Sequence, residues 1–237
     1  MAKGKNKKVT RKDKKKKNEK HTFAKKEWFQ LISPTAVKKT VPIGWTCCKK
    51  PTGTERVQDF LNGRIGEMCY GDITQNKNDI PKKIRFVIEE VNGRSCVTSF
   101  YGFELMRDVV MEKLKKRQSL IEIYQDVKTK DGSIFRVFLM VVTKRSQNQV
   151  KLNSYAQHSK IRVLRKKLQQ EMLTKAASLP ADAFAHEIII DLLNTELEAH
   201  AKKILMNCKL LVYKVKTVKR GNVDLKQLIN SVEETQK

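Results

Sequence analysis

Two turn dipeptides, Asn92-Gly93 and Asp131-Gly132, constrain the fold of this chain most, because each separates two strand-like segments. Asn-Gly and Asp-Gly tolerate the positive φ that tight hairpin turns require. Segments 84–91 and 95–100 around the first dipeptide therefore predict a β-hairpin with a type I′ turn, in which both central residues have positive φ.

The second dipeptide predicts a longer hairpin, from 120–128 to 134–143. Ile121, Ile123 and Val127 alternate with polar residues, as in a strand with one buried face. Residues 135–142 of the return strand are apolar except for Arg136, which indicates burial on both faces. Antiparallel strands of this kind favour a closed or nearly closed barrel, since closure removes exposed edges.

Helical spacing predicts four helices around these strands. Residues 104–118 have apolar residues at helical intervals and cations at the C-terminal end, where the helix dipole favours them. A second helix begins near Ser154, which with Gln157 resembles a capping box. Its apolar stripe consists of Ile161, Leu164, Leu168 and Met172. Residues 182–193 and 195–205 predict two more helices, the last capped by Asn194 or Thr195.

A last strand over 209–220 would place Leu211, Tyr213 and Val215 on one face. We therefore predict an α+β fold: an antiparallel, barrel-like β-sheet domain with peripheral helices, the helical region covering about 154–206. Residues 21–237 are expected to form this single domain.

Residues 1–20 are predicted to be a disordered basic arm. They contain 11 Lys or Arg and two acids, a net charge of +9, and almost no apolar residues, so they cannot form a core. RNA contact is the favoured interpretation, and a nuclear-localisation tract or a solubility tail is the alternative.

The charge of the whole chain indicates a polyanionic partner. It has 50 Lys and Arg against 25 Asp and Glu, a net charge of +25. Nucleic acid is the first candidate. An anionic membrane is the second, but there is neither a spanning apolar run nor a signal-peptide core, so we expect a cytosolic or nuclear protein.

The five cysteines indicate free thiols in a reducing compartment, because their number is odd and no export signal precedes them. Structural zinc is the alternative, but it needs ligand pairs two to four residues apart, and no such Cys or His pair occurs. Cys47 and Cys48 are adjacent and would point to opposite faces of a strand. We expect no metal and no cofactor.

An acid-free run is the strongest local signal for RNA binding. Residues 132–170 contain nine Lys or Arg and no Asp or Glu over 39 positions. Tyr155 and His158 are placed to stack on a base or ribose, with local packing as the alternative. Trp28 lies beside Lys25 and Lys26, where it either stacks on unpaired nucleotides or anchors the arm to the domain.

Signatures of an enzyme are absent from the sequence. His186-Glu187 begins like a zincin helix, yet Ile190 occupies the second ligand position. Residues 168–200 hold six acids and one base, and Glu187, Asp191, Glu196 and Glu198 are expected on exposed helical faces that meet solvent or a protein neighbour. An RNA-modifying enzyme and a free nucleic-acid chaperone are the alternatives to a structural RNA-binding role.

Several long strings resemble one family, the archaeal and eukaryotic small-subunit ribosomal proteins called eS-one, older name S-three-a. They are "GKNKKVTRKDKKKK" from Gly4, "FAKKEWF" from Phe23, "NGRIGE" from Asn62, "GRSCVTSFYGFEL" from Gly93, "DVKTKDG" from Asp126 and "SYAQHSKIRVLRKK" from Ser154. Residues 181–206 match loosely, and the longer polar tail of many eukaryotic members has no counterpart, since the chain stops at Lys237.

The resemblance implies a barrel-like domain on the platform of the small subunit, contacting the 3′ region of its ribosomal RNA and neighbouring proteins. It implies a cytoplasmic ribosomal protein that passes through the nucleus or nucleolus during assembly, without a membrane or small-molecule partner. The charge runs and the strings together predict RNA contacts by Lys7, Lys8, Arg11, Lys12, Lys14, Lys15, Lys16, Lys17, Lys25, Lys26, Trp28, Arg64, Lys115, Lys116, Arg117, Lys144, Arg145, Tyr155, His158, Lys160, Arg162, Arg165, Lys166 and Lys167.

Overall fold

The computed structural model describes residues 22–221. The predicted disordered arm, 1–20, lies outside the described residues. The strands are β1 Lys26–Ile32, β2 Pro42–Lys49, β3 Ile65–Cys69, β4 Lys82–Asn92, β5 Ser95–Leu105, β6 Leu120–Lys128, β7 Ile134–Thr143 and β8 Cys208–Lys219. The α-helices are α2 Val57–Leu61, α3 Tyr70–Thr74, α4 Arg107–Lys113, α5 His158–Ser178, α6 Ala181–Ile189 and α7 Leu192–Ile204. Three short 3-10 helices are η1 Thr22–Lys25, η2 Thr35–Val37 and η3 Lys77–Asp79.

Both predicted hairpins are confirmed, β4–β5 and β6–β7. The type I′ turn of the first is wrong. Asn92 pairs with Ser95, so Gly93 and Arg94 are the central residues, and of these only Gly93 has positive φ (59°). Positive φ at the first central residue alone is typical of a type II′ turn, which takes Gly there.

The α+β class is confirmed, whereas barrel-like closure is not. The eight strands form an open sheet in the order β2-β1-β5-β8-β7-β6, with β4 on the other edge of β5 and β3 beyond it. Among the described residues no strand pairs with the outer edge of β6. Helix α5 packs along this strand, and the Gln169 amide donates to the Tyr124 carbonyl (3.4 Å), so a helix protects the edge that closure would have removed.

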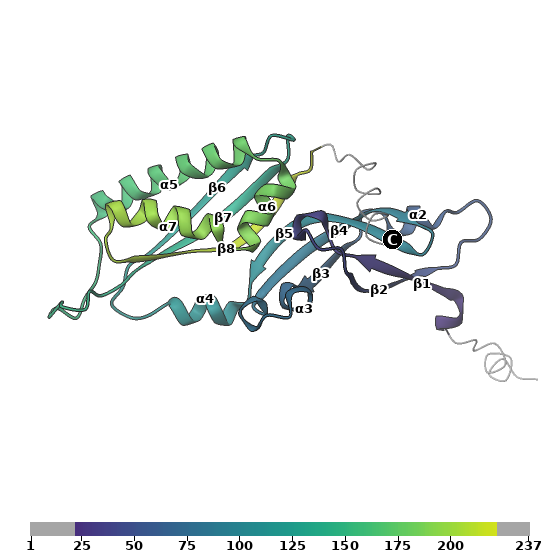
Figure 1. Cartoon of the computed structure of the whole chain (residues 1–237), viewed down its shortest axis with the longest axis horizontal. Helices are drawn as coiled ribbons and strands as arrows, with labels where there is room; N and C mark the ends of the chain where they lie inside the picture. The colour runs from purple at the N-terminus through teal and green to yellow at the C-terminus, as the bar shows by residue number, and fades with distance from the viewer. Residues whose placement is uncertain (1–21, 222–237) are drawn as a thin grey trace, which may run out of the picture.

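Strand β5 joins the two halves of the elongated molecule seen in Figure 1. Strand β4 pairs along all of one edge. The other edge is shared: β1 pairs in parallel with Ser95 and Cys96, and β8 pairs antiparallel with 102–104. Gly102 permits this approach, because a Cβ there would lie 2.9 Å from the Val215 carbonyl oxygen.

Helices α5, α6 and α7 cover one face of the sheet formed by β6, β7 and β8 (Figure 1). The predicted stripe of α5 is confirmed, with Leu164, Leu168 and Met172 fully buried in the main core beside Ile121 and Ile123 of β6. Aromatic rings extend this core toward β5: Phe184 stacks on Phe135 (6.2 Å), which contacts the edge of Phe100 (5.9 Å).

Three predicted helix boundaries are wrong. Helix α4 is shorter than 104–118, because Glu104 and Leu105 belong to β5. Ser154 does not cap α5, since its hydroxyl donates to the Arg117 carbonyl (3.1 Å) and the helix begins at His158. Helix α7 begins at Leu192 after Asp191, whose φ is 62°, rather than at Asn194 or Thr195.

The predicted faces of the last strand are also wrong. A β-bulge at Tyr213 shifts the register, so that Phe138 pairs with Lys214 and Leu139 with Val212. The buried face of β8 therefore holds Leu210, Val212 and Val215, while Leu211 and Tyr213 are half-buried on the opposite side. In β7 the predicted two-sided burial holds only from Leu139 to Thr143.

Candidate RNA-binding surface

Three chain segments that are distant in sequence are hydrogen-bonded at one end of the molecule. The backbone N–H of Ser119 donates to the Thr143 hydroxyl (2.9 Å), and that hydroxyl donates to the Ser154 carbonyl (2.7 Å). The Ser154 N–H donates in turn to the Arg117 carbonyl (3.0 Å). The loop after α7 is a fourth segment, and its Asn207 carbonyl accepts a hydrogen bond from the Lys144 N–H (2.7 Å). These bonds hold the loops after α4, β7 and α7 together with the start of α5.

The cations of these segments form a surface that we call the basic tip. Its residues are Lys115, Lys116, Arg117, Lys144, Arg145, Lys151, Lys160 and Arg162, all exposed. Segments 114–119, 143–162 and 205–207 contain no Asp or Glu. None of the ion pairs formed within residues 22–221 includes a cation of the tip. Such unpaired cations on fixed loops are suited to bind phosphates.

Two polar aromatic residues lie in the same surface. Tyr155 is 62% exposed, so its ring does not pack in the protein, and its hydroxyl and ring face are accessible. His158 is the first residue of α5 and is also exposed. Both rings remain accessible for stacking on a base or ribose.

Five cations of the predicted contact set lie along α5, and they differ in environment. Arg162 and Lys166 are exposed. Arg165 is half-buried beside β6 in a hollow of about 430 Å³ that Glu122 and Asp126 also line. Lys167 forms an ion pair with Glu171 one turn later (2.6 Å), just beyond the acid-free run.

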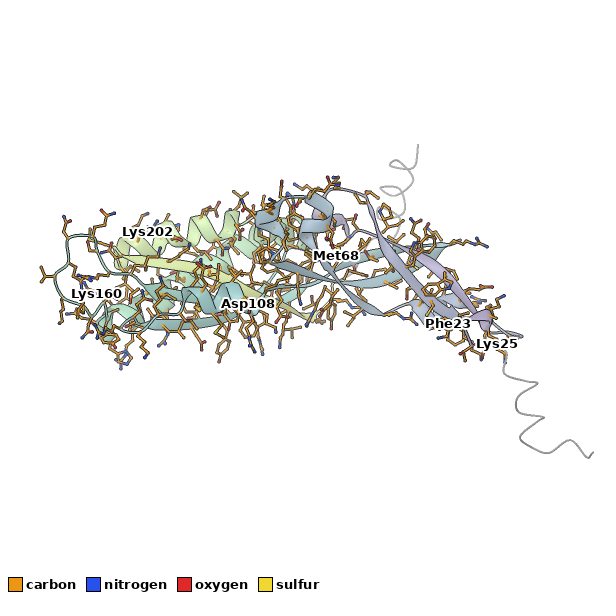
Figure 2. All side chains as sticks on the ribbon, turned by 90° about the horizontal axis from the view of Figure 1, so that it is seen from below. Phe23, Lys25, Met68, Asp108, Lys160 and Lys202 are labelled. Atoms are coloured by element: carbon orange, nitrogen blue, oxygen red, sulfur yellow. The ribbon has the colours of Figure 1, made fainter. Side chains whose placement is uncertain are left out.

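The predicted contacts Lys25, Lys26, Trp28 and Arg64 lie far from the tip. Figure 2 places Phe23 and Lys25 at one end of the molecule and Lys160 and Lys202 toward the other. The Arg64 guanidinium donates to the Thr46 hydroxyl (2.6 Å) and the Cys47 carbonyl (3.0 Å), and so braces β2. The predicted contacts from Lys7 to Lys17 lie outside the described residues.

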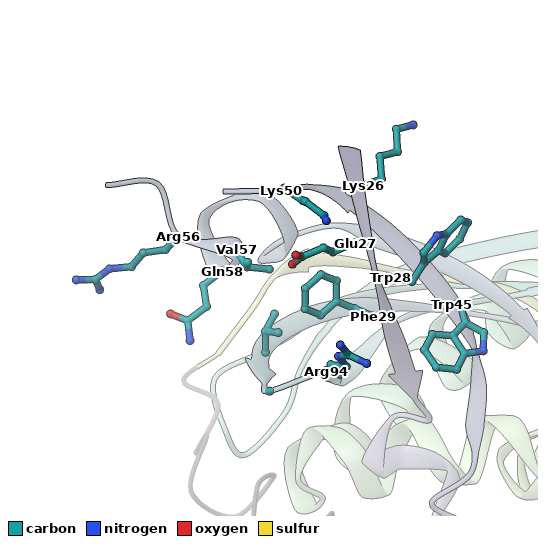
Figure 3. A pocket seen from close by; sticks show the side chains of 12 residues that line it. Lys26, Glu27, Trp28, Phe29, Trp45, Lys50, Arg56, Val57, Gln58 and Arg94 are labelled. Carbon is teal, nitrogen blue, oxygen red and sulfur yellow. The ribbon is translucent and has the colours of Figure 1, made fainter. Parts of the chain in front are cut away.

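A groove near the start of β1 was not predicted from the sequence (Figure 3). It has a volume of about 920 Å³ and is lined by Lys26, Trp28, Trp45, Lys50, Arg56 and Arg94, with Glu27. The residues that contribute most of its charge are spread over two loops and one strand. Spacing within one segment therefore gives no signal for it.

The acidic residues of 168–200 are partly engaged with lysines. Lys175 lies 2.7 Å from Glu196 and 3.5 Å from Glu187, and its hydrogen bond to Glu196 raises its pKa, opposed by burial. Asp191 was expected on an exposed face but lies 2.7 Å from the buried Lys82. Glu198 pairs with Lys202 (2.7 Å). Only Glu196 of the four predicted acids is fully on the surface.

The described part of the chain contains neither a metal-ligand cluster nor a membrane-spanning helix. No group of three or more His, Cys, Asp or Glu side chains is arranged to hold an ion there. The five cysteines are free thiols, with Cys48 buried and Cys47 half-buried, as their opposite strand faces require. No helix between residues 22 and 221 is long and apolar enough to cross a membrane.

This chain is similar to known proteins along most of its sequence. Residues 14–221 match the model of the Ribosomal S3Ae family. Two curated relatives, from Theileria parva and Theileria annulata, are each named small ribosomal subunit protein eS1. Each is 34% identical to this chain over 232 residues, which cover 98% of the chain and 88% of the relative. The chain, with its acid-free basic tip and the strings quoted above, therefore belongs to the ribosomal S3Ae family.

Proposed function

We propose that this chain is a structural constituent of the small ribosomal subunit that binds ribosomal RNA mainly through the basic tip. Membership of the S3Ae family is the main support for this proposal, and the exposed cations of the basic tip are the groups that would bind RNA. The family consists of structural ribosomal proteins, so we assign no catalytic activity to the chain.

The tip binds RNA by neutralising phosphates and releasing the counterions that surround them. Its cations come from three segments, so they follow the shape of a folded RNA backbone rather than the sequence of its bases. Tyr155 and His158 add stacking surfaces at unpaired nucleotides. Lys116, Lys144 and Lys160 are the residues that we expect to contribute most, because each lies on a different segment and is exposed.

Finer features of this role rest on the family resemblance. We propose that the chain lies on the platform, near the 3′ region of the small-subunit ribosomal RNA, and passes through the nucleolus during assembly. The surface of α6 and α7 that bears Glu196 would face solvent or a protein neighbour, because carboxylates repel phosphates. A continuous core on both sides of β5 supports one domain over the described part of 21–237.

Sedimentation tests the proposed function. A tagged copy of the full chain is expected to sediment with small subunits in a sucrose gradient, and to remain with them at high salt because many contacts form together. A free RNA chaperone would instead sediment as a light, salt-labile fraction. That second outcome would contradict the proposal.

A further inference from the structure

Three exposed aromatic rings form a row at the end of the molecule opposite the basic tip. Phe23, Trp28 and Trp45 are 59%, 48% and 61% exposed. Phe23 stacks on Trp28 with ring centroids 6.4 Å apart and an angle of 10° between the planes. Trp28 pairs with Cys47 and Trp45 with Gln30, so the two indoles occupy diagonal positions on one face of the β1–β2 ribbon. We call these three residues the aromatic row.

The groove described above runs beside this row, along a free edge of β1. Strand β1 pairs with β5 only through Gln30 and Leu31. The Gln30 N–H donates to the Arg94 carbonyl (2.8 Å), so the N–H of Trp28, two residues earlier, points toward the same side. Strand β2 pairs with Trp28 on the opposite edge of β1, but no strand of the described chain pairs with Trp28 on this edge. A backbone donor therefore lines the groove.

The charge of the groove favours an anionic occupant. Four cationic side chains line it, from Lys26, Lys50, Arg56 and Arg94, against the single carboxylate of Glu27 (Figure 3). The Lys26 ammonium lies 4.8 Å from the Phe23 ring centre, beside the row. Aromatic faces next to cations and a free N–H are the elements with which proteins hold single-stranded nucleic acid.

Packing among residues 22–221 does not account for the exposed rings. Phe29, between Trp28 and Gln30, is the residue that anchors β1, since it is 5% exposed and lies in a core cluster with Cys48, Leu61 and Ile88. Trp28 points to the other side of the strand and stays exposed. The anchor and the exposed indole are therefore separate residues.

We propose that the aromatic row and its groove bind an unpaired stretch of RNA, with bases stacked on Trp28 and Trp45 and phosphates against Lys50, Arg56 and Arg94. This second contact rests on the proposed function for the identity of the RNA, but its binding chemistry is independent of the tip. The molecule would then hold RNA at both of its ends.

Tryptophan fluorescence of the full chain tests the proposal directly, because Trp28 and Trp45 are its only two tryptophans. Titration with an oligouridylate of about 12 nucleotides is expected to quench their emission, as stacking on a base does. Replacing both by leucine (W28L with W45L) removes the stacking faces, and affinity for a labelled oligouridylate should fall about tenfold per tryptophan. Phenylalanine at both positions should retain most of the affinity.

Control variants separate this proposal from the general effect of charge or folding. Tyr124→Leu removes an aromatic ring that is 66% exposed on β6, outside the row, and should leave oligouridylate affinity unchanged. Circular dichroism verifies that each variant is folded. If the leucine double variant does not fold, the phenylalanine double variant is measured in its place.

Two outcomes would overturn the proposal: no quenching by oligouridylate, or an unchanged affinity of the folded leucine pair. If the aromatic row were shielded from solvent only in assembled subunits, and the tryptophan emission did not respond to RNA, a protein neighbour would be the occupant of the row. Failure of the proposed function looks different. Quenching would persist, while charge reversal at the tip would not alter binding to ribosomal RNA.

Discussion

Reversing three charges of the basic tip is expected to flatten the salt dependence of RNA binding without unfolding the protein. In the variant, Lys116, Lys144 and Lys160 are replaced together by glutamate. Each is exposed and belongs to a different segment. If each contacts one phosphate, the slope of log affinity against log salt should fall by about 0.7 to 0.9 per residue, about 2 to 3 in total. Incorporation into small subunits should fail in parallel.

A matched variant shows whether position or total charge matters. Lys77, Lys128 and Lys130 are also exposed but lie outside the tip, and their replacement by glutamate changes the net charge equally. We expect this variant to keep most of the salt slope and to enter particles. Thermal unfolding and RNA binding are measured on the same preparations. Two results would refute RNA binding by the tip. One is a lowered melting temperature of the tip variant, and the other is the same salt slope in the unmodified chain, the tip variant and the matched variant.

Replacing the buried Lys82 by methionine should cost the fold about 3 kcal/mol of unfolding free energy. The side chain is 10% exposed, and its ammonium contacts Asp79 (3.0 Å), Asp191 (2.7 Å) and the Ile189 carbonyl (2.8 Å). Methionine keeps the volume but leaves Asp79 without its cation, and breaking a buried pair costs about 3 to 5 kcal/mol. The lower end of this range applies because the Asp191 side chain is 40% exposed, so its pair with Lys82 is only partly buried. Lys83→Met, at the exposed neighbouring position, is the control.

The pH dependence of the Lys82 effect follows from the two pKa shifts. Burial acts to raise the pKa of Asp79, but hydrogen bonding and the charge of Lys82 lower it overall, so its contribution to stability is lost in acid. Burial acts to lower the pKa of Lys82, while Asp191 and Asp79 raise it overall, so its contribution persists at neutral pH. Chemical denaturation should show the stability gap to Lys82→Met narrowing below the ordinary aspartate value of 3.8. A gap that stays constant into acid would contradict this.

The parts of the fold that depend on local sequence were predictable. Turn residues identified both hairpins, and periodicity identified the buried stripe of α5. Strands β1 and β2 were not predicted, because Trp28 and Trp45 are exposed large aromatics and do not follow an apolar-inside pattern. Leu211 and Tyr213 were assigned to the same face of β8 as Val215 because a single bulged residue changes the phase of the alternation, and nothing in the residue type of Tyr213 marks the bulge.

The start of α7 was missed for a tertiary reason. Asn194 has the composition of a cap, yet its amide oxygen accepts the Val212 N–H (2.8 Å) and its amide group donates to Asp191 (2.6 Å). The helix begins before it because these partners lie in β8 and in the preceding turn. A local propensity cannot report a partner that is distant in sequence.

The candidate site was predictable in its charge but not in its assembly. The acid-free run supplied Lys144, Arg145 and Lys160, but its association with 115–117 depends on hydrogen bonds between loops. The ion pair of Lys167 lay one residue beyond the run, at Glu171. Separation of Lys25 and Trp28 from the tip follows from the order of strands, which the sequence pattern does not specify.

Strand β5 has a mechanical consequence. It is 11 residues long, roughly 35 Å. Its pairing with β4 runs the whole length of the strand, while β1 and β8 pair near its two ends, so one strand pair joins the halves of the protein. If both ends hold RNA, the molecule acts as a strut of fixed span. RNA segments at the matching separation would be clamped together, and segments at any other separation would engage one end only.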